Sequence, residues 1–309
     1  MIKFCTLVLT VSFALCLCAC GAGYREINSE YLVSAIGFDN ENGSFRVYAQ
    51  VLAISEEKKD SECKLFEGVG KTPYEAVANI DSQLPKKAVF DHCSTALIGE
   101  SIAGKRFKTV MEYLYDTKNL NLGISLYATR DIKEVLSSDS QALSSGYDIM
   151  AIKSNIENST GIGFKNRYYE ICALQIKNGG FCLPAVSVND NRPEISGQYV
   201  YVDFSNVFEL SRGETVVYNL LRGGSSGGEL SVSGKRLRIN GIKVNIENKE
   251  GVISARIHCN YRQKSDELGG AIKAETEKLL KKIQNTPAVI PLGIEQNEKG
   301  KNPRVSVYG

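Results

Sequence analysis

The chain has 309 residues, of which 43% are hydrophobic and 23% are charged, and its formal net charge is +2. This composition is typical of a folded globular protein, and the length exceeds the ~100–200 residues of a single domain, which predicts two or more domains. The nearly neutral charge gives no reason to expect binding to nucleic acid or to another polyanion.

Residues 1–19 have the layout of a secretory signal peptide. Lys3 precedes an apolar run over residues 4–17, which is shorter than the ~20 residues that span a bilayer. The run ends in Leu17-Cys18-Ala19-Cys20-Gly21, where small residues flank a cysteine as in a bacterial lipoprotein box. We therefore predict cleavage before Cys20 and lipidation of Cys20, which would hold the mature chain at a membrane. The alternative is an ordinary signal peptide or an anchor that is never cleaved.

Residues 20–190 alternate between strand and helix patterns, which predicts an N-terminal α+β domain. Strands are expected at residues 31–38, 45–54, 65–69, 123–129 and 182–188. Helices are expected at residues 73–83, 131–136, 147–156 and 168–176, with a further helix after Ser101. Asn42-Gly43 predicts a tight hairpin turn, and Thr72 and Ser101 are expected to cap helices. The first helix should bury Tyr74, Val77, Ala78 and Ile80, and the helix after Ser101 should bury Phe107, Val110, Met111 and Leu114.

The turn-forming segment at residues 189–193 is the predicted boundary to a C-terminal α+β domain at residues 191–309. A strand at residues 195–202 precedes a helix that a capping box of Ser211 and Glu214 should begin. Further strands are expected at residues 229–232 and 304–308, with a long antiparallel hairpin over residues 236–246 and 252–261. The amphipathic pattern at residues 271–283 predicts a helix that packs on this hairpin.

Five cysteines remain after cleavage and lipidation: Cys63, Cys93, Cys172, Cys182 and Cys259. Their number is odd and no Cys-x-x-Cys pair survives, so a zinc ribbon or a thioredoxin-like site lacks its basic unit. Most lie beside apolar residues, and a free thiol behaves as a small buried hydrophobic group. We interpret them as core residues, with a Cys172–Cys182 disulfide or another redox role left open.

His92 lies between Asp91 and Cys93, three residue types that serve in nucleophilic or metal sites. In a strand the two neighbours would point to the face opposite His92, so this spacing gives no local catalytic pair. A structural hydrogen-bonding role for His92 is favoured, with catalysis or metal ligation as the alternative.

Gly223-Gly224-Ser225-Ser226-Gly227 fits the Gly-x-Ser-x-Gly pattern of a nucleophile elbow. An elbow lies between a strand and a helix, whereas a predicted strand follows this segment, so a flexible loop is favoured. No phosphate loop, metal spacing or catalytic triad stands out along the chain. The sequence therefore predicts no enzyme, no catalytic residue, no cofactor and no metal.

Several segments resemble the Ger(x)C family, the lipoprotein C subunits of spore germinant receptors. The most specific are Arg25-Glu26-Ile27, Ala35-Ile36-Gly37-Phe38-Asp39, and the block from Pro85-Lys86-Lys87 through His92 to Ile98-Gly99-Glu100. A weaker match is Leu221-Arg222-Gly223 at the end of the predicted helix. The chain departs from the family pattern at Gly21–Tyr24, and its segment after the predicted helix at 271–283 is short and without tryptophan.

The resemblance implies several α+β domains with packed helices and no catalytic residues. It also implies a lipid anchor on the outer face of the spore inner membrane, integral-membrane A and B subunits as partners, and a role in receptor assembly or in relaying the germination signal. An alternative from another class is a solute-binding lipoprotein of a membrane transporter, and a third is a cell-envelope hydrolase that uses Ser225 or His92.

Overall fold

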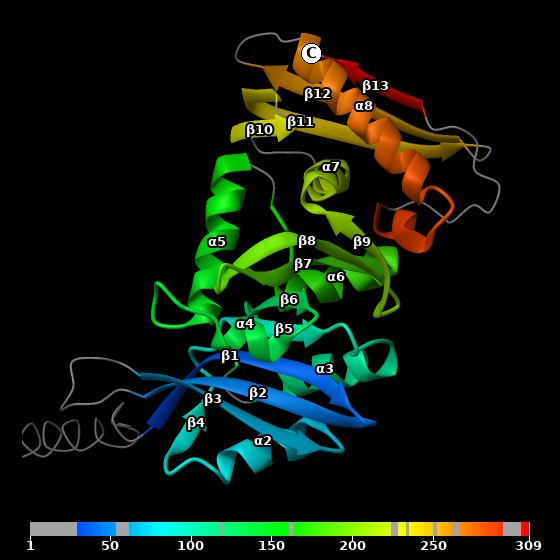
Figure 1. Ribbon diagram of the computed structural model, residues 1–309. Helices are drawn as coiled ribbons and strands as arrows, with labels where there is room; N and C mark the ends of the chain where they lie inside the picture. Colours follow the sequence, from blue (N-terminus) through cyan, green and yellow to red (C-terminus); the bar gives the residue numbers. More distant parts are fainter. Residues whose placement is uncertain are drawn as a thin grey trace, which may run out of the picture.

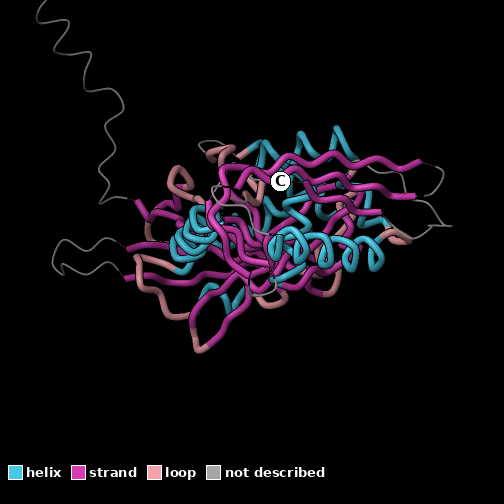
Figure 2. The backbone as a smooth tube through the Cα atoms, turned by 90° about the horizontal axis from the view of Figure 1, so that it is seen from above, coloured by secondary structure: helices cyan, strands magenta, loops and turns pink. Residues whose placement is uncertain are grey.

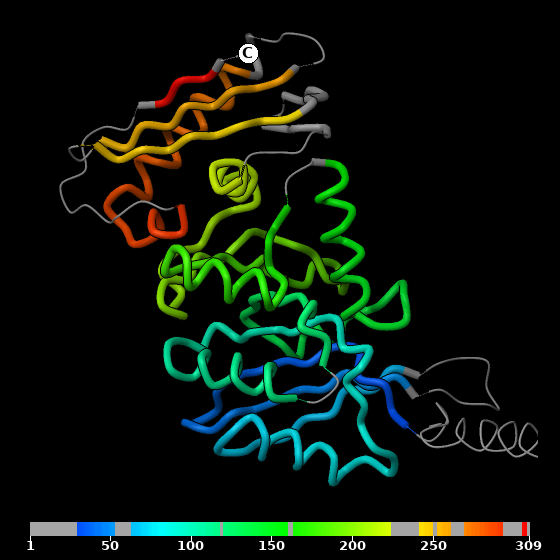
Figure 3. Tube along the Cα trace, turned by 180° about the vertical axis from the view of Figure 1, so that it is seen from behind, coloured from blue at the N-terminus to red at the C-terminus, as the bar shows by residue number. Residues whose placement is uncertain are grey.

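The computed structural model describes residues 30–53, 62–117, 120–160, 163–223, 228–232, 235–249, 252–261, 266–292 and 304–308. A mixed sheet with helices on both faces forms one end of an elongated molecule, and a second sheet with its own helices forms the other end (Figure 1). Seen from behind, the chain proceeds from the first sheet to the second in sequence order (Figure 3). This arrangement confirms the predicted α+β class with mixed sheets and packed helices.

Nine described strands form the first sheet, in the order β3-β2-β1-β5-β6-β7-β8-β9, with the short strand β4 paired to β1. Their bounds are β1 Glu30–Glu41, β2 Ser44–Ala53, β3 Glu62–Gly70, β4 Lys87–Val89, β5 Thr95–Gly99, β6 Ser125–Thr129, β7 Gly180–Asn189, β8 Arg192–Val202 and β9 Ser205–Ser211. The strands β1, β5, β6 and β7 run parallel, and antiparallel hairpins extend the sheet at both sides.

Successive side chains of a strand point to opposite faces of the sheet, and in these strands both sets include apolar residues. Helices therefore cover both faces of the sheet. On β1, Ile36 and Phe38 pack with three helices: α2 Pro73–Asp81, α3 Lys105–Asp116 and α6 Tyr168–Asn178. Ala35, on the opposite face, packs with α4 Ile132–Ser137 and α5 Ser145–Thr160. The central parallel strands are therefore enclosed, and their ends carry the loops that a site can use.

The second sheet has the order β10-β11-β12-β13, with β13 parallel to β12 and the other pairs antiparallel. Its elements are β10 Gly228–Val232, β11 Lys235–Lys249, β12 Val252–Tyr261, α8 Asp266–Ile283, the 3-10 helix η2 Pro287–Leu292 and β13 Arg304–Tyr308. The helix α7 Arg212–Gly223 lies between the two sheets, and one apolar cluster joins it to Val200 of β8 and Ile257 of β12 (Figure 1). Viewed from above, strands run through the middle of the molecule and helices lie among and beside them (Figure 2).

Most local predictions are confirmed. Asn42 and Gly43 form the β1–β2 turn with φ angles of 47° and 87°, and Thr72 Oγ1 accepts a hydrogen bond from Glu75 N at the start of α2. Ser211 and Glu214 form the predicted capping box, since Ser211 N donates to Glu214 Oε2 at 3.0 Å and Glu214 N donates to Ser211 Oγ at 3.4 Å.

Two local predictions are wrong. Ser101 does not cap α3, which begins after Gly104 at a φ of 54°; the hydroxyl of Ser101 instead donates to the carboxylate of Asp39. On α2, Tyr74 is 48% exposed and Ala78 is also exposed, while Ala76 takes part in the core. The helix is therefore rotated relative to the predicted face.

The hairpin turn at Asp190 and Asn191 joins β7 to β8, and both strands lie in the first sheet. The sheet thus continues across the position at which the sequence suggests a domain boundary, and the division into residues 20–190 and 191–309 stays a prediction.

Candidate functional site

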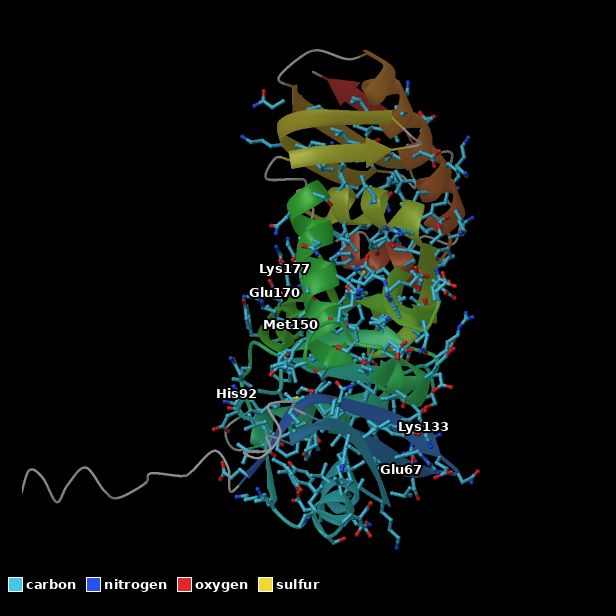
Figure 4. All side chains as sticks on the ribbon, turned by 60° about the vertical axis from the view of Figure 1, so that its left-hand side comes forward. Glu67, His92, Lys133, Met150, Glu170 and Lys177 are labelled. Atoms are coloured by element: carbon cyan, nitrogen blue, oxygen red, sulfur yellow. The ribbon has the colours of Figure 1, made fainter. Side chains whose placement is uncertain are left out.

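A groove of about 820 Å³ opens where the segments that precede β5 and β6 meet α5 and the start of α6. Because β5 and β6 are parallel, these two segments enter the sheet from the same edge. The charged or hydroxyl-bearing side chains that line the groove include Asp91, His92, Ser94, Lys153, Glu157 and Arg167. Figure 4 shows that His92 and Met150, which both line the groove, lie on the same side of the molecule.

Backbone hydrogen bonds fix the floor of the groove. Ser125 N donates to Ser94 O at 2.9 Å, and an isolated antiparallel bridge pairs Ser125 with Arg167. Leu126 N donates to the backbone oxygen of Asn166 at 2.8 Å. Ser94, Ser125 and Arg167 are therefore neighbours, although they come from three separate segments of the sequence.

The wall of the groove carries a pair of opposite charges on α5. Lys153 and Glu157 are one helical turn apart, and Lys153 Nζ lies 3.6 Å from Glu157 Oε1. The same Glu157 oxygen accepts a hydrogen bond from Phe164 N at 2.9 Å, which holds the loop before Arg167. Arg167 Nη1 donates to Tyr169 Oη at 3.2 Å. The groove thus combines fixed positive and negative groups with hydroxyl donors.

His92 lies in this groove, and Asp91 and His92 form an exposed turn rather than part of a strand. The backbone oxygen of His92 accepts a hydrogen bond from Tyr147 Oη at 3.5 Å. Cys93 is 1% exposed, and burial raises the pKa of its thiol to about 12, which disfavours the thiolate that a nucleophile needs. Asp91, His92 and Cys93 do not form a catalytic arrangement.

The cysteines have no disulfide among them in the described residues. Cys93, Cys182 and Cys259 are buried and Cys172 is half-buried, as the core interpretation predicts, whereas Cys63 is exposed. Cys172 and Cys182 are both free, so the disulfide alternative is not realised in this structure.

Two parts of the family resemblance lie side by side in the first sheet. Ala35-Ile36-Gly37-Phe38 of β1 pairs in register with Thr95-Ala96-Leu97-Ile98 of β5. A Cβ at Gly99 would lie 2.6 Å from Asp39 Oδ1, and the Asp39 carboxylate also accepts from Asn40 N at 2.8 Å. The motif residues therefore serve close packing and strand pairing at the centre of the sheet.

Three sequence predictions fall outside the described residues: Cys20 with its signal peptide, Arg25-Glu26-Ile27, and Ser225 of the Gly-rich segment. Among the described residues, no group of three or more His, Cys, Asp or Glu side chains could hold a metal ion. No described helix is both long enough and apolar enough to cross a membrane.

The groove itself is missed by the sequence analysis. The sequence carries one indication of the groove, which is the four-residue spacing of Lys153 and Glu157 that places opposite charges on one face of a helix. Lys153 lies inside the helix predicted at residues 147–156, and Glu157 follows it directly. Arg167 and Ser94 become neighbours only through backbone pairing between segments that are far apart in the sequence. The local sequence around each residue therefore gives no indication that both line the same groove.

Comparison with known proteins gives the family. No curated protein sequence matches the chain. A solved structure described as "Crystal Structure of the GerBC protein" is similar over 88% of this chain and 96% of that chain, with a TM-score of 0.48 and 14% sequence identity. Residues 23–188, more than half of the 309 residues, match the family described as "Spore germination protein N-terminal domain", which confirms the resemblance. The chain therefore belongs to this family of spore germination proteins.

Proposed function

We propose that the chain is a non-catalytic, lipid-anchored C subunit of a spore germinant receptor, attached through Cys20 to the outer face of the spore inner membrane. It would support assembly of the receptor with integral-membrane A and B subunits, or relay the nutrient signal between them. The observation that carries this proposal is the family match over residues 23–188. The lipoprotein-like segment Leu17-Cys18-Ala19-Cys20-Gly21 supports the mode of attachment.

The fold is compatible with a tether at this point. The strand β1 begins at Glu30, about ten residues after Cys20, and a chain of that length reaches at most ~35 Å. The first sheet, to which β1 belongs, lies at the end of the molecule opposite to the second sheet (Figures 1 and 3). A lipid on Cys20 would therefore keep the first sheet near the membrane and leave the second sheet farther from it.

The anchor is tested by Cys20→Ala, with Cys18→Ala as the matched control because Cys18 is the neighbouring cysteine of the signal. We expect the wild-type chain and Cys18→Ala in the membrane fraction, and Cys20→Ala outside it, because two acyl chains supply the membrane affinity. Unchanged membrane retention of Cys20→Ala would contradict the proposal. The same strains, assayed for nutrient-triggered germination, would report whether attachment matters for function.

The partners are tested by cross-linking the chain in spore membranes and identifying the captured proteins by mass spectrometry. Two multi-spanning membrane proteins are expected as the A and B subunits. Capture of an ATPase and a permease instead would favour the alternative of a solute-binding lipoprotein.

A further inference from the structure

Lys153 lines the groove with most of its side chain buried. The residue is only 9% exposed, and its one polar contact among the described residues is Glu157 Oε1 at 3.6 Å, too long for a hydrogen bond. The ammonium group has three donors, and a buried charge is costly unless hydrogen bonds satisfy it. Lys153 makes no hydrogen bond among the described residues, so its donors remain available to another group.

Ser94 lies at the floor of the same groove. Its Oγ atom is buried and has no hydrogen-bond partner within the described part of the chain. Ser94 lies next to Ser125, which in turn pairs with Arg167. Buried polar atoms in folded proteins are nearly always paired, so the unpaired hydroxyl of Ser94 is an unusual feature of the groove floor.

Arg167 adds an exposed positive charge, and the carboxylates of Glu170 and Glu157 lie in its electrostatic surroundings. No acidic oxygen lies within ion-pair distance of its guanidinium among the described residues, and its side chain donates only to Tyr169 Oη. Glu157 and Asp91 also line the groove. Glu157 is already engaged with Phe164 and Lys153, and Asp91 lies on an exposed turn. The cationic groups available to a ligand are thus the Lys153 ammonium, which makes no hydrogen bond among the described residues, and the exposed Arg167 guanidinium.

We propose that this groove binds a small water-soluble molecule through a carboxylate or phosphate group. Lys153 and Arg167 would pair with the negative charge. The volume of about 820 Å³ lies within the range of small-molecule sites. Tyr169 and Met150 give the groove an apolar margin for the remainder of the molecule. This ligand role goes beyond receptor assembly and does not depend on the lipid anchor.

The proposal is tested by titrating the purified full chain with sodium acetate and, separately, sodium phosphate, at constant ionic strength kept with sodium chloride. Saturable binding in the millimolar range, seen by calorimetry and as a rise in Tm, is expected for at least one of the two anions. Acetate and phosphate distinguish the carboxylate from the phosphate form. Lys153→Met should weaken binding about tenfold or more, because it removes a charge-assisted hydrogen bond.

Lys177→Met is the matched control, since Lys177 is an exposed lysine on α6, away from His92 on the same side of the molecule (Figure 4). Arg167→Gln changes an exposed residue, and it should weaken binding even if Lys153→Met unfolds the chain. No saturable binding of either anion, or equal binding by wild type, Arg167→Gln and Lys177→Met, would overturn the proposal. Lys153-dependent binding to phosphatidylglycerol vesicles without binding of the free anions would also overturn it, and would assign the groove to a lipid headgroup.

Discussion

The hydroxyl of Tyr218 donates a 2.6 Å hydrogen bond to the backbone oxygen of Ala288, and both residues are 0% exposed. This contact joins α7, between the two sheets, to η2 near the end of the chain. Burial raises the pKa of Tyr218 well above its usual value, so the hydroxyl stays protonated and remains a donor.

Tyr218→Phe should therefore lower the free energy of unfolding by about 1–2 kcal/mol, because it leaves a buried carbonyl oxygen without a donor. Urea unfolding followed by circular dichroism measures the change. Tyr115→Phe is the matched control, since Tyr115 is 65% exposed and should lose almost nothing. Equal midpoints for the two variants would show that the contact does not stabilise the fold.

Gly37→Ala should destabilise the first sheet, because a Cβ at this position would overlap Ile132 Cγ2 of α4. Ile132 is 1% exposed and cannot move freely, so a loss of about 1–3 kcal/mol is expected. A double-mutant cycle with Ile132→Ala measures the clash, since alanine lacks the overlapping methyl group. The double variant should be less destabilised than the sum of the two single variants, and strict additivity would contradict the packing described for Gly37.

Cys63 should react with iodoacetamide in the folded chain, whereas Cys93 and Cys182 should react only after unfolding. Cys63 is exposed, but partial burial raises the pKa of its thiol to about 11. The thiolate is the reactive form, so labelling of Cys63 should increase about tenfold per pH unit and continue to rise beyond the ~8.5 of a free cysteine. Mass spectrometry of labelled peptides, with Cys63→Ser as control, reports each site. A labelling rate that levels off near pH 8.5 would contradict the raised pKa.

The ion pair between Glu214 and Lys282, at 2.6 Å, should make the packing of α7 on α8 sensitive to acid. Burial alone would raise the pKa of Glu214, but the hydrogen bonds from Lys282 and Ser211 outweigh it and leave the pKa below its usual value. Because the folded pKa is the lower one, the stabilisation is present above the usual pKa of glutamate and is lost as pH falls through the folded value.

Glu214→Gln should accordingly cost about 1 kcal/mol at neutral pH, since it weakens both a helix cap and a partly exposed ion pair, and the cost should shrink toward pH ~4. Chemical unfolding of wild type and variant at both pH values measures this difference. Glu112→Gln changes an exposed glutamate of α3 and should show no such trend. A cost for Glu214→Gln that is independent of pH would rule out the titration of Glu214 as its cause.

Local chemistry allowed much of the fold to be predicted. The Asn42-Gly43 turn, the Thr72 cap and the Ser211–Glu214 capping box depend on residues that are close in sequence, and all three are present. Helical spacing also identified the buried face of α3, which includes Phe107 and Leu114.

The wrong predictions concern side chains whose positions depend on contacts with segments that are distant in the sequence. On α2, Ala76 lies against β3, and the helix backbone is so close there that a Cβ at Gly68 would lie 2.2 Å from Ala76 O. Tyr74 turns toward α3 instead, where its ring lies 4.9 Å from that of Tyr113 and its hydroxyl donates to Asp116. The groove could not be predicted from the sequence for the same reason, since pairing between strands and loops places Ser94, Ser125 and Arg167 together.

The uninterrupted first sheet also determines which fragments of this chain can be produced. A fragment that stops at Val188, where the family match ends, would remove β8 and expose the hydrogen-bonding edge of β7. Such an edge attracts strands of other molecules and leads to aggregation. A recombinant fragment that retains β8 and β9 through Ser211 keeps this edge covered. It would still uncover Val200 and Leu210, which α7 and the second sheet bury, so the two halves of the chain depend on each other.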